Sequence, residues 1–144
     1  MNSTKKILCA VDFGELTEKI LLQAKELAGF LNAKVYVIYV VRPLDTIEQF
    51  AVPKSFREQY INEILGKANE KVKELKETIG ADEKFEFLIK SGDPVKEILD
   101  LIEKEKIDMV IIGAVSKKTF GETLFGSVGE KVLKLSKVPV LVIK

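Results

Sequence analysis

Stretches of the chain in which every residue is apolar alternate with longer stretches in which apolar residues recur every three or four positions. The uninterrupted runs are short and rich in valine and isoleucine, which predicts strands buried on both faces, as in a parallel sheet. Residues 85–89 instead alternate around Glu86, which predicts a half-buried or edge strand. The predicted strands are residues 7–11, 35–41, 85–89, 109–112 and 138–143.

Helices are predicted between these strands, where the apolar residues gather on one face at the helical period. The first helix begins near Thr17, and a long second helix runs from Phe56 to Gly80, a residue type that commonly ends helices. Asp93-Pro94 predicts a third helix, with Asp as the N-cap residue and Pro at the first helical position. A fourth helix precedes the last strand.

Five strands with helices between them predict an α/β fold, a doubly wound five-stranded parallel sheet with helices on both faces. Residues 1–144 are expected to form a single domain. Ligands of such sheets bind outside the carboxyl ends of the strands, where the strand order reverses. If the first and fourth strands are neighbours, the loops that follow them face one crevice. The long connection Leu44–Lys54 either covers that crevice or merely links two elements.

Composition and charge exclude several classes of function. A net charge of +1 gives no global field to attract nucleic acid or acidic membranes, and no apolar run approaches transmembrane length. We therefore expect a cytoplasmic protein with no nucleic-acid or membrane partner. The sequence has no histidine, which removes the usual general base and the commonest metal ligand, so no catalytic residue is predicted. Cys9, the single cysteine, lies in an apolar run and is expected to be a buried hydrophobe.

The loop from Gly113 to Ser127 joins a predicted buried strand to a predicted helix. Backbone N–H groups converge at such a place and the helix N-terminus adds positive partial charge, so this loop is a candidate phosphate site. Gly126 permits a close approach of phosphate to the backbone. The alternative is a structural loop, with Gly113 as an ordinary turn residue and Lys117 and Lys118 simply solvated. Neither a P-loop motif nor a G-x-G-x-x-G motif after the first strand is present.

Two further features each have a functional and a structural interpretation. Asp12 ends the first strand, where a carboxylate can accept hydrogen bonds from a ribose or hold water around a cation, or else satisfy N–H groups of its own turn. Ser127 and Glu130 have the S-x-x-E spacing of a capping box, which predicts that both side chains cap the last helix. The N–H groups of Ser127 and Val128 would still be available to a phosphate.

Six segments in order make the chain resemble a universal stress protein domain over essentially its whole length. They are ILCAVD at 7–12, VIYVVRP at 37–43, SGDPVKEIL at 91–99, DMVIIG at 108–113, GSVGEKVL at 126–133 and VPVLVIK at 138–144. The resemblance implies a fold similar to that of adenine nucleotide α-hydrolases, a homodimer, and ATP binding in one branch of the family. The other branch does not bind ATP.

The resemblance also implies particular site residues. The family's phosphate motif, which is Gly, two residues, Gly, nine residues, Gly and then Ser or Thr, falls on Gly113, Ser116, Gly126 and Ser127. Asp12 would contact the ribose or, through water, a Mg or Mn ion that accompanies ATP, with no side chain binding the metal directly. The backbone of Val40 would contact the adenine edge. The other residues implied in or near the pocket are Ala10, Val11, Val128 and Gly92.

Ser116 departs from the motif, which has glycine there. If the loop needs a positive φ at this position, serine costs about 1–2 kcal/mol relative to glycine, and ATP affinity falls by about one order of magnitude. The serine N–H remains available, so the sequence predicts weakened nucleotide binding rather than none.

Besides a small-molecule enzyme that uses the same crevice, two functions follow as hypotheses. The first is a regulatory protein that binds ATP with a divalent cation and hydrolyses it slowly or not at all. The second is a dimeric interaction module without nucleotide. In both, the apolar last strand from Val138 to Ile143 is expected to lie at the sheet edge and pair with a second copy of the chain. The alternative for this strand is burial by helices on both faces.

Overall fold

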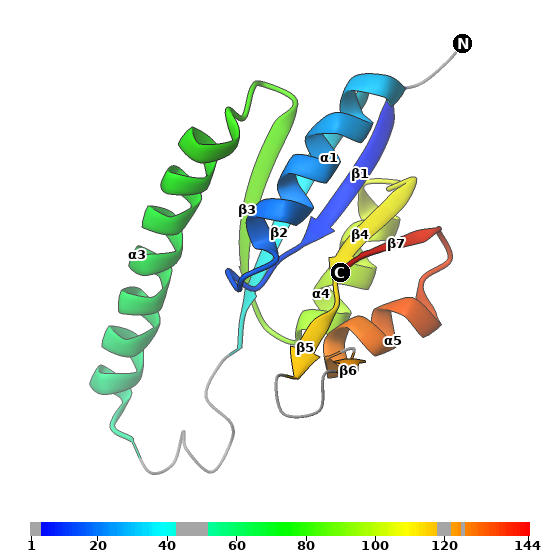
Figure 1. The fold of residues 1–144 in the computed structure, drawn as a ribbon. Helices are drawn as coiled ribbons and strands as arrows, with labels where there is room; N and C mark the ends of the chain where they lie inside the picture. The colour runs from blue at the N-terminus through cyan, green and yellow to red at the C-terminus, as the bar shows by residue number, and fades with distance from the viewer. Residues whose placement is uncertain (1–3, 43–51, 118–121, 125) are drawn as a thin grey trace.

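The computed structural model describes residues 4–42, 52–117, 122–124 and 126–144. One parallel sheet has the strand order β3-β2-β1-β4-β7, and β5 and β6 form a separate antiparallel pair (Figure 1). The predicted α/β class with a five-stranded parallel sheet is thereby confirmed. The elements are β1 (Lys5–Ala10), α1 (Thr17–Leu31), β2 (Ala33–Val41), α3 (Lys54–Ile79), β3 (Phe85–Ser91), α4 (Pro94–Lys104), β4 (Met109–Gly113), β5 (Val115–Lys117), β6 (Glu122–Leu124), α5 (Ser127–Leu135) and β7 (Val140–Ile143).

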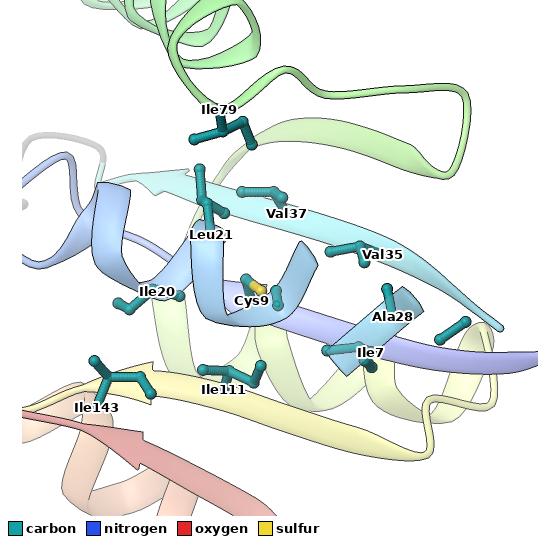
Figure 2. Packing of buried hydrophobic residues seen from close by; sticks show 12 residues of the cluster. Ile7, Cys9, Ile20, Leu21, Ala28, Val35, Val37, Ile79, Ile111 and Ile143 are labelled. Carbon is teal, nitrogen blue, oxygen red and sulfur yellow. The ribbon is translucent and has the colours of Figure 1, made fainter. Parts of the chain in front are cut away.

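Helices cover both faces of the sheet, and successive strand residues point to opposite faces. One core cluster joins α1 and the C-terminal end of α3 to the sheet, and Figure 2 shows its members, which include Ile7, Cys9, Leu21, Val37 and Ile79. The other cluster joins α4 and α5 to the opposite face through residues such as Leu8, Ile38, Ile98 and Val132. Cys9 is fully buried, as the sequence predicts, and this burial raises the pKa of its thiol.

Local sequence explains where the helices begin and end. Asp93 caps α4, because its side chain accepts a hydrogen bond of 2.9 Å from the backbone N–H of Lys96, and Pro94 is the first helical residue. Gly80 ends α3 in the left-handed conformation with φ of 62°, which glycine adopts without steric cost. Both predicted boundaries are confirmed.

Two predictions need correction. The last strand begins at Val140 instead of Val138, because Ser136 and Val138 form a turn in which the Ser136 hydroxyl donates to the carbonyl of Val138 at 2.9 Å. The stretch from Gly113 to Ser127 is not only a loop, since it contains the hairpin of β5 and β6. Most of the Leu44–Lys54 connection lies outside the described residues.

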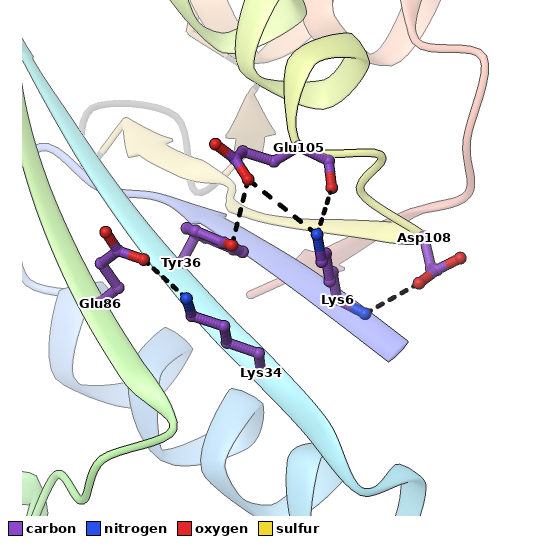
Figure 3. Close-up of polar contacts among 6 residues, drawn as sticks. All are labelled: Lys6, Lys34, Tyr36, Glu86, Glu105 and Asp108. Atoms are coloured by element: carbon purple, nitrogen blue, oxygen red, sulfur yellow. Dashed lines mark hydrogen bonds and ion pairs between the residues drawn. The ribbon is translucent and has the colours of Figure 1, made fainter. Parts of the chain in front are cut away.

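Polar contacts tie the strands together at the amino edge of the sheet (Figure 3). The Nζ of Lys6 donates to the backbone carbonyl of Glu105 at 2.9 Å, and the hydroxyl of Tyr36 donates to Oε2 of Glu105 at 3.2 Å. Lys34 and Glu86 form an ion pair of 2.9 Å between β2 and β3, and this hydrogen bond raises the pKa of Lys34. These contacts belong to the framework and lie at the end of the strands opposite to the candidate site.

None of the helices formed by the described residues is long and apolar enough to cross a membrane.

Candidate functional site

The strand order reverses between β1 and β4, which are parallel neighbours with Cys9 in register with Ile111. From β1 the chain continues to β2 and β3 on one side, whereas β4 leads to β7 on the other. The loops after β1 and β4 therefore open on the same crevice, which is the usual ligand position in such a sheet. A cavity of about 830 Å³ lies there, within the usual size range of small-molecule sites.

Most of the residues implied by the family resemblance line this cavity. They are Ala10, Val11, Asp12, Val40, Gly113, Gly126, Ser127 and Val128. They come from the ends of β1, β2 and β4, from the two residues after β1 and from the start of α5. The topology thus brings together residues that are more than a hundred positions apart in the sequence.

Gly92 lies elsewhere, and of Ser116 the structure describes only the backbone. Gly92 is not among the described lining residues, and its N–H donates to the carbonyl of Val41 at 3.0 Å in the turn before α4. Its φ of 148° and a distance of 3.0 Å between an added Cβ and Oε1 of Glu97 explain why glycine stands there. The backbone of Ser116 lies in β5, in register with Thr123 of β6.

The turn after β1 gives Asp12 a local partner. The backbone N–H of Gly14 donates to Oδ1 of Asp12 at 2.7 Å, as the structural interpretation of this carboxylate predicts. The Asp12 side chain is exposed at the cavity, and no hydrogen bond joins its other oxygen, Oδ2, to a described residue. The carboxylate is therefore oriented by its own turn and still has one oxygen available for a ligand.

The predicted capping box at the start of α5 is wrong. Gly126 is the N-cap residue, with extended backbone at φ of −67° and ψ of 162°, and Ser127 is already helical. No side chain of the described residues caps the helix, and Glu130 instead forms an ion pair of 3.0 Å with Lys134 one turn further on. The first N–H groups of α5 lack acceptors within the helix and lie at the cavity wall, an arrangement suited to an anion.

The cavity also has an apolar wall that the sequence analysis did not identify. Tyr60 and Ile64, on the first turns of α3, line it together with Val40 and Val41 at the end of β2. Their apolar spacing predicts the buried face of a helix. Only the placement of α3 beside the sheet, with its first turns extending past the strands (Figure 1), shows that they border the crevice. Flat or apolar ligand groups fit this side, and charged groups fit the side of Asp12 and α5.

Charged lining groups are few. Asp12 and Glu15 are the acidic ones and Arg42 and Lys144 the basic ones among the described lining residues. Within the described part of the chain, no group of three or more His, Cys, Asp or Glu side chains could hold a metal ion. A cation in this cavity would therefore need oxygen ligands from water or from the bound molecule.

Comparison with known proteins shows the family of the chain. The family model described as the universal stress protein family matches residues 3–144. Universal stress protein MJ0531 of Methanocaldococcus jannaschii is 33% identical over 147 residues, which cover 99% of this chain and 84% of the relative. Universal stress protein MJ0577 of the same organism is 33% identical over 154 residues, which cover 97% of this chain and 94% of the relative.

Solved structures agree with the fold. The structure of MJ0577 has a TM-score of 0.79 at 32% identity and covers 97% of this chain and 95% of its own. UspA from Lactobacillus plantarum has a TM-score of 0.81 at 18% identity, with coverage of 99% and 100%. A universal stress protein from Archaeoglobus fulgidus in complex with dAMP has a TM-score of 0.62 at 24% identity, with coverage of 97% and 98%. A universal stress protein in complex with cAMP has a TM-score of 0.64 at 23% identity, with coverage of 99% and 98%.

Proposed function

Since this chain belongs to the universal stress protein family, we propose that it is a regulatory protein that binds ATP with a Mg or Mn ion in the cavity at the carboxyl edge of the sheet. The observation that carries the proposal is that one cavity contains both the N-terminus of α5 and the Asp12 carboxylate. The helix N-terminus favours an anion such as phosphate, and the carboxylate favours a sugar with hydroxyl groups.

The phosphate end of the proposed site is formed by Gly113, Gly126, Ser127 and Val128. Gly126 has no side chain to keep a phosphate away from the backbone, and the first N–H groups of α5 are unpaired within the helix. Arg42 and Lys144 also line the cavity and add positive charge. Together these groups would hold the polyphosphate without a P-loop.

The base and ribose would lie toward β1 and β2. Val40, Val41, Tyr60 and Ile64 supply apolar surface for a planar ring, and Asp12 stands at the end of β1 to accept a hydrogen bond from a sugar hydroxyl. The cation would be bound by phosphate oxygens and water, with Asp12 contacting it through water. The dAMP and cAMP complexes of two structurally similar proteins add support, because both ligands contain adenine.

The proposal includes slow or no hydrolysis of ATP. The sequence has no histidine. Among the described lining residues, only Asp12 and Glu15 have carboxylates, and Asp12 already accepts a hydrogen bond from its own turn. In this proposal Asp12 contacts the sugar and neither carboxylate acts as a general base toward a terminal phosphate, and binding without turnover suits a regulatory protein.

Titration calorimetry with ATP and Mg²⁺ tests the proposal, with Gly126→Asp and Gly126→Asn as a matched pair of variants. Both Asp and Asn are favourable N-cap residues, and the extended backbone of Gly126 accepts them, so both variants should fold. Only Asp adds a negative charge beside the phosphates. We expect Gly126→Asp to bind ATP at least about tenfold more weakly than Gly126→Asn. Absence of heat at millimolar ATP with the unchanged protein would overturn the proposal.

We further propose that the protein is a homodimer that pairs through β7. This strand lies at the edge of the sheet, and its Val140, Leu141 and Val142 are only partly buried. Leu133 and Leu135 of the neighbouring α5 are 42% and 58% exposed. A second copy paired along this edge would cover an apolar surface that a monomer leaves in water. An interaction module without nucleotide would have the same surface, so calorimetry distinguishes the two functions.

A further inference from the structure

We propose that Phe13 and Gly14 are positioning residues that fix the direction of the Asp12 carboxylate and thereby give the site its preference for a sugar with free hydroxyl groups. The inference rests on the proposed function, because it concerns how the same cavity would distinguish its ligands. It assigns a role to two residues beside Asp12 that the family motif does not cover.

Gly14 is required by the position of the Asp12 side chain. A Cβ added to Gly14 would lie 2.8 Å from Oδ1 of Asp12 and 3.4 Å from its Cγ, and the first of these distances is shorter than real Cβ contacts allow. Gly14 is not among the described glycines with positive φ, so the reason for glycine is this contact and not the backbone angle. Any other residue at position 14 must displace the carboxylate or the turn.

The same glycine also binds the carboxylate. Its N–H donates to Oδ1 of Asp12 at 2.7 Å, and its carbonyl accepts from the N–H of Thr17 at 3.1 Å at the start of α1. Asp12 is therefore linked through Gly14 to the first turn of a helix that packs in the core. A displacement of Gly14 would reach the carboxylate directly.

Phe13 stands in a conformation that residues with a side chain rarely adopt. Its φ is 61°, in the left-handed region, which disfavours a bulky L-residue. The Phe13 ring packs against Tyr39 of β2, with ring centroids 4.4 Å apart and planes at 51°, and Nζ of Lys71 on α3 lies 5.8 Å from the ring centroid. These contacts oppose the backbone strain and hold the turn against two other elements.

The residue before Asp12 is fixed as well. The N–H of Val11 donates to the carbonyl of Ile38 at 3.0 Å, which extends the pairing of β1 and β2 by one residue. Asp12 thus lies between a strand end and a packed turn, with Oδ1 held by Gly14 and Oδ2 unpaired among the described residues. A carboxylate fixed in this way can accept hydrogen bonds from ribose hydroxyls at little entropic cost, whereas a mobile one must first be ordered.

Calorimetric titration with ATP and with 2′,3′-dideoxy-ATP tests the inference. We expect the unchanged protein to bind ATP about tenfold or more tightly than the dideoxy nucleotide, as for a hydrogen bond to a charged group. In Gly14→Ala this preference should fall to about threefold or less, while affinity for the dideoxy nucleotide stays within about twofold. A purely structural defect would instead lower the affinity for both nucleotides by the same factor. Gly66→Ala is the matched control, because an added Cβ at Gly66 meets nothing within 4 Å.

Two further variants show whether Gly14 acts through Asp12. In an Asp12→Asn background, Gly14→Ala should change the nucleotide preference no further. The reason is that the effects of substitutions at two coupled residues do not add. Phe13→Gly relieves the backbone strain but loses the Tyr39 contact, and we expect it to lower the preference as well. This variant also serves if Gly14→Ala does not fold.

The outcomes separate this inference from the proposed function. If the unchanged protein binds neither nucleotide, the proposed function fails and the inference fails with it. If it binds both but Gly14→Ala and Phe13→Gly keep its preference for ATP, only the inference is overturned. The same holds if the unchanged protein binds the two nucleotides equally well.

Discussion

Gly113 at the end of β4 packs directly against Ile20 of α1, since an added Cβ on Gly113 would lie 3.0 Å from Cδ1 of Ile20. Leu16, just before the helix, is almost as close, with its Cδ1 at 3.3 Å. Ile20 belongs to the core cluster shown in Figure 2. The glycine that the family resemblance places in a phosphate motif therefore also lets α1 approach the sheet, whether or not a ligand is bound.

Gly113→Ala should accordingly destabilise the protein. Its methyl group would press on Ile20 and Leu16, and overpacking of this kind costs about 1–3 kcal/mol, which exceeds the gain of up to about 1 kcal/mol from replacing glycine in a strand. We expect a net loss of about 1 kcal/mol in the free energy of unfolding, measured by urea denaturation. Gly66→Ala, in the middle of α3 and in open space, should instead gain about 0.5–1 kcal/mol. Equal stabilisation by both variants would contradict the packing role of Gly113.

The fold was predictable from the sequence because its strongest signals are local and agree with one another. The apolar runs around Cys9, Val37 and Ile111 form the three central strands. Asp93-Pro94 marks the start of one helix and Gly80 the end of another, because few other residue types suit these positions. The short strands β5 and β6 were not predicted, since segments such as Val-Ser-Lys are too short to show a period.

The site was predictable only in part, because some of it depends on tertiary geometry. Asp12 and Gly126 could be predicted because they lie in loops, one after a strand and one before a helix. The sheet topology brings these two loops together. Tyr60 lines the cavity because the first turns of α3, which runs beside the sheet, extend past the strands, and helical spacing alone does not reveal that placement. The capping box failed for a local reason: Gly126 adopts the extended N-cap conformation, which leaves Ser127 inside the helix and without a capping role.

Ser116 should tolerate replacement by glycine with little effect on ATP affinity. The sequence suggested a penalty for serine if the position needs a positive φ, but Ser116 lies in strand β5, where the backbone is extended and any residue fits. We therefore expect Ser116→Gly to change the dissociation constant for ATP by less than about threefold, measured by calorimetry. Tightening by about tenfold would show instead that the bound state needs a left-handed backbone at residue 116.

Cys9 should be inert in the folded protein. It is completely buried between β1 and α1, and burial raises the pKa of its thiol because a thiolate there would lose its hydration. At pH 8, where an exposed cysteine is partly ionised, the native protein should react with a disulfide reagent only as fast as it unfolds. The same reagent should label one thiol at once in denaturant. Immediate labelling of the folded protein would show that this part of the core opens readily.

Pairing through β7 can be tested with a single backbone group. The carbonyl of Pro139 accepts a hydrogen bond from Val110 of β4, and that of Ile143 accepts one from Ala114 just after β4. By alternation the N–H of Val142 therefore points to the free edge of the sheet. Val142→Pro removes that N–H and leaves the pairing with β4 intact, since proline is accepted where a strand N–H faces outward. The loss occurs in both copies of a symmetric dimer, and two hydrogen bonds of about 1 kcal/mol each correspond to an approximately thirtyfold weaker dimer. Sedimentation analysis should detect this shift, whereas Val142→Thr, which keeps both the N–H and the branched shape, should remain dimeric. A sedimentation profile for Val142→Pro identical to that of the unchanged protein would exclude β7 as the pairing edge.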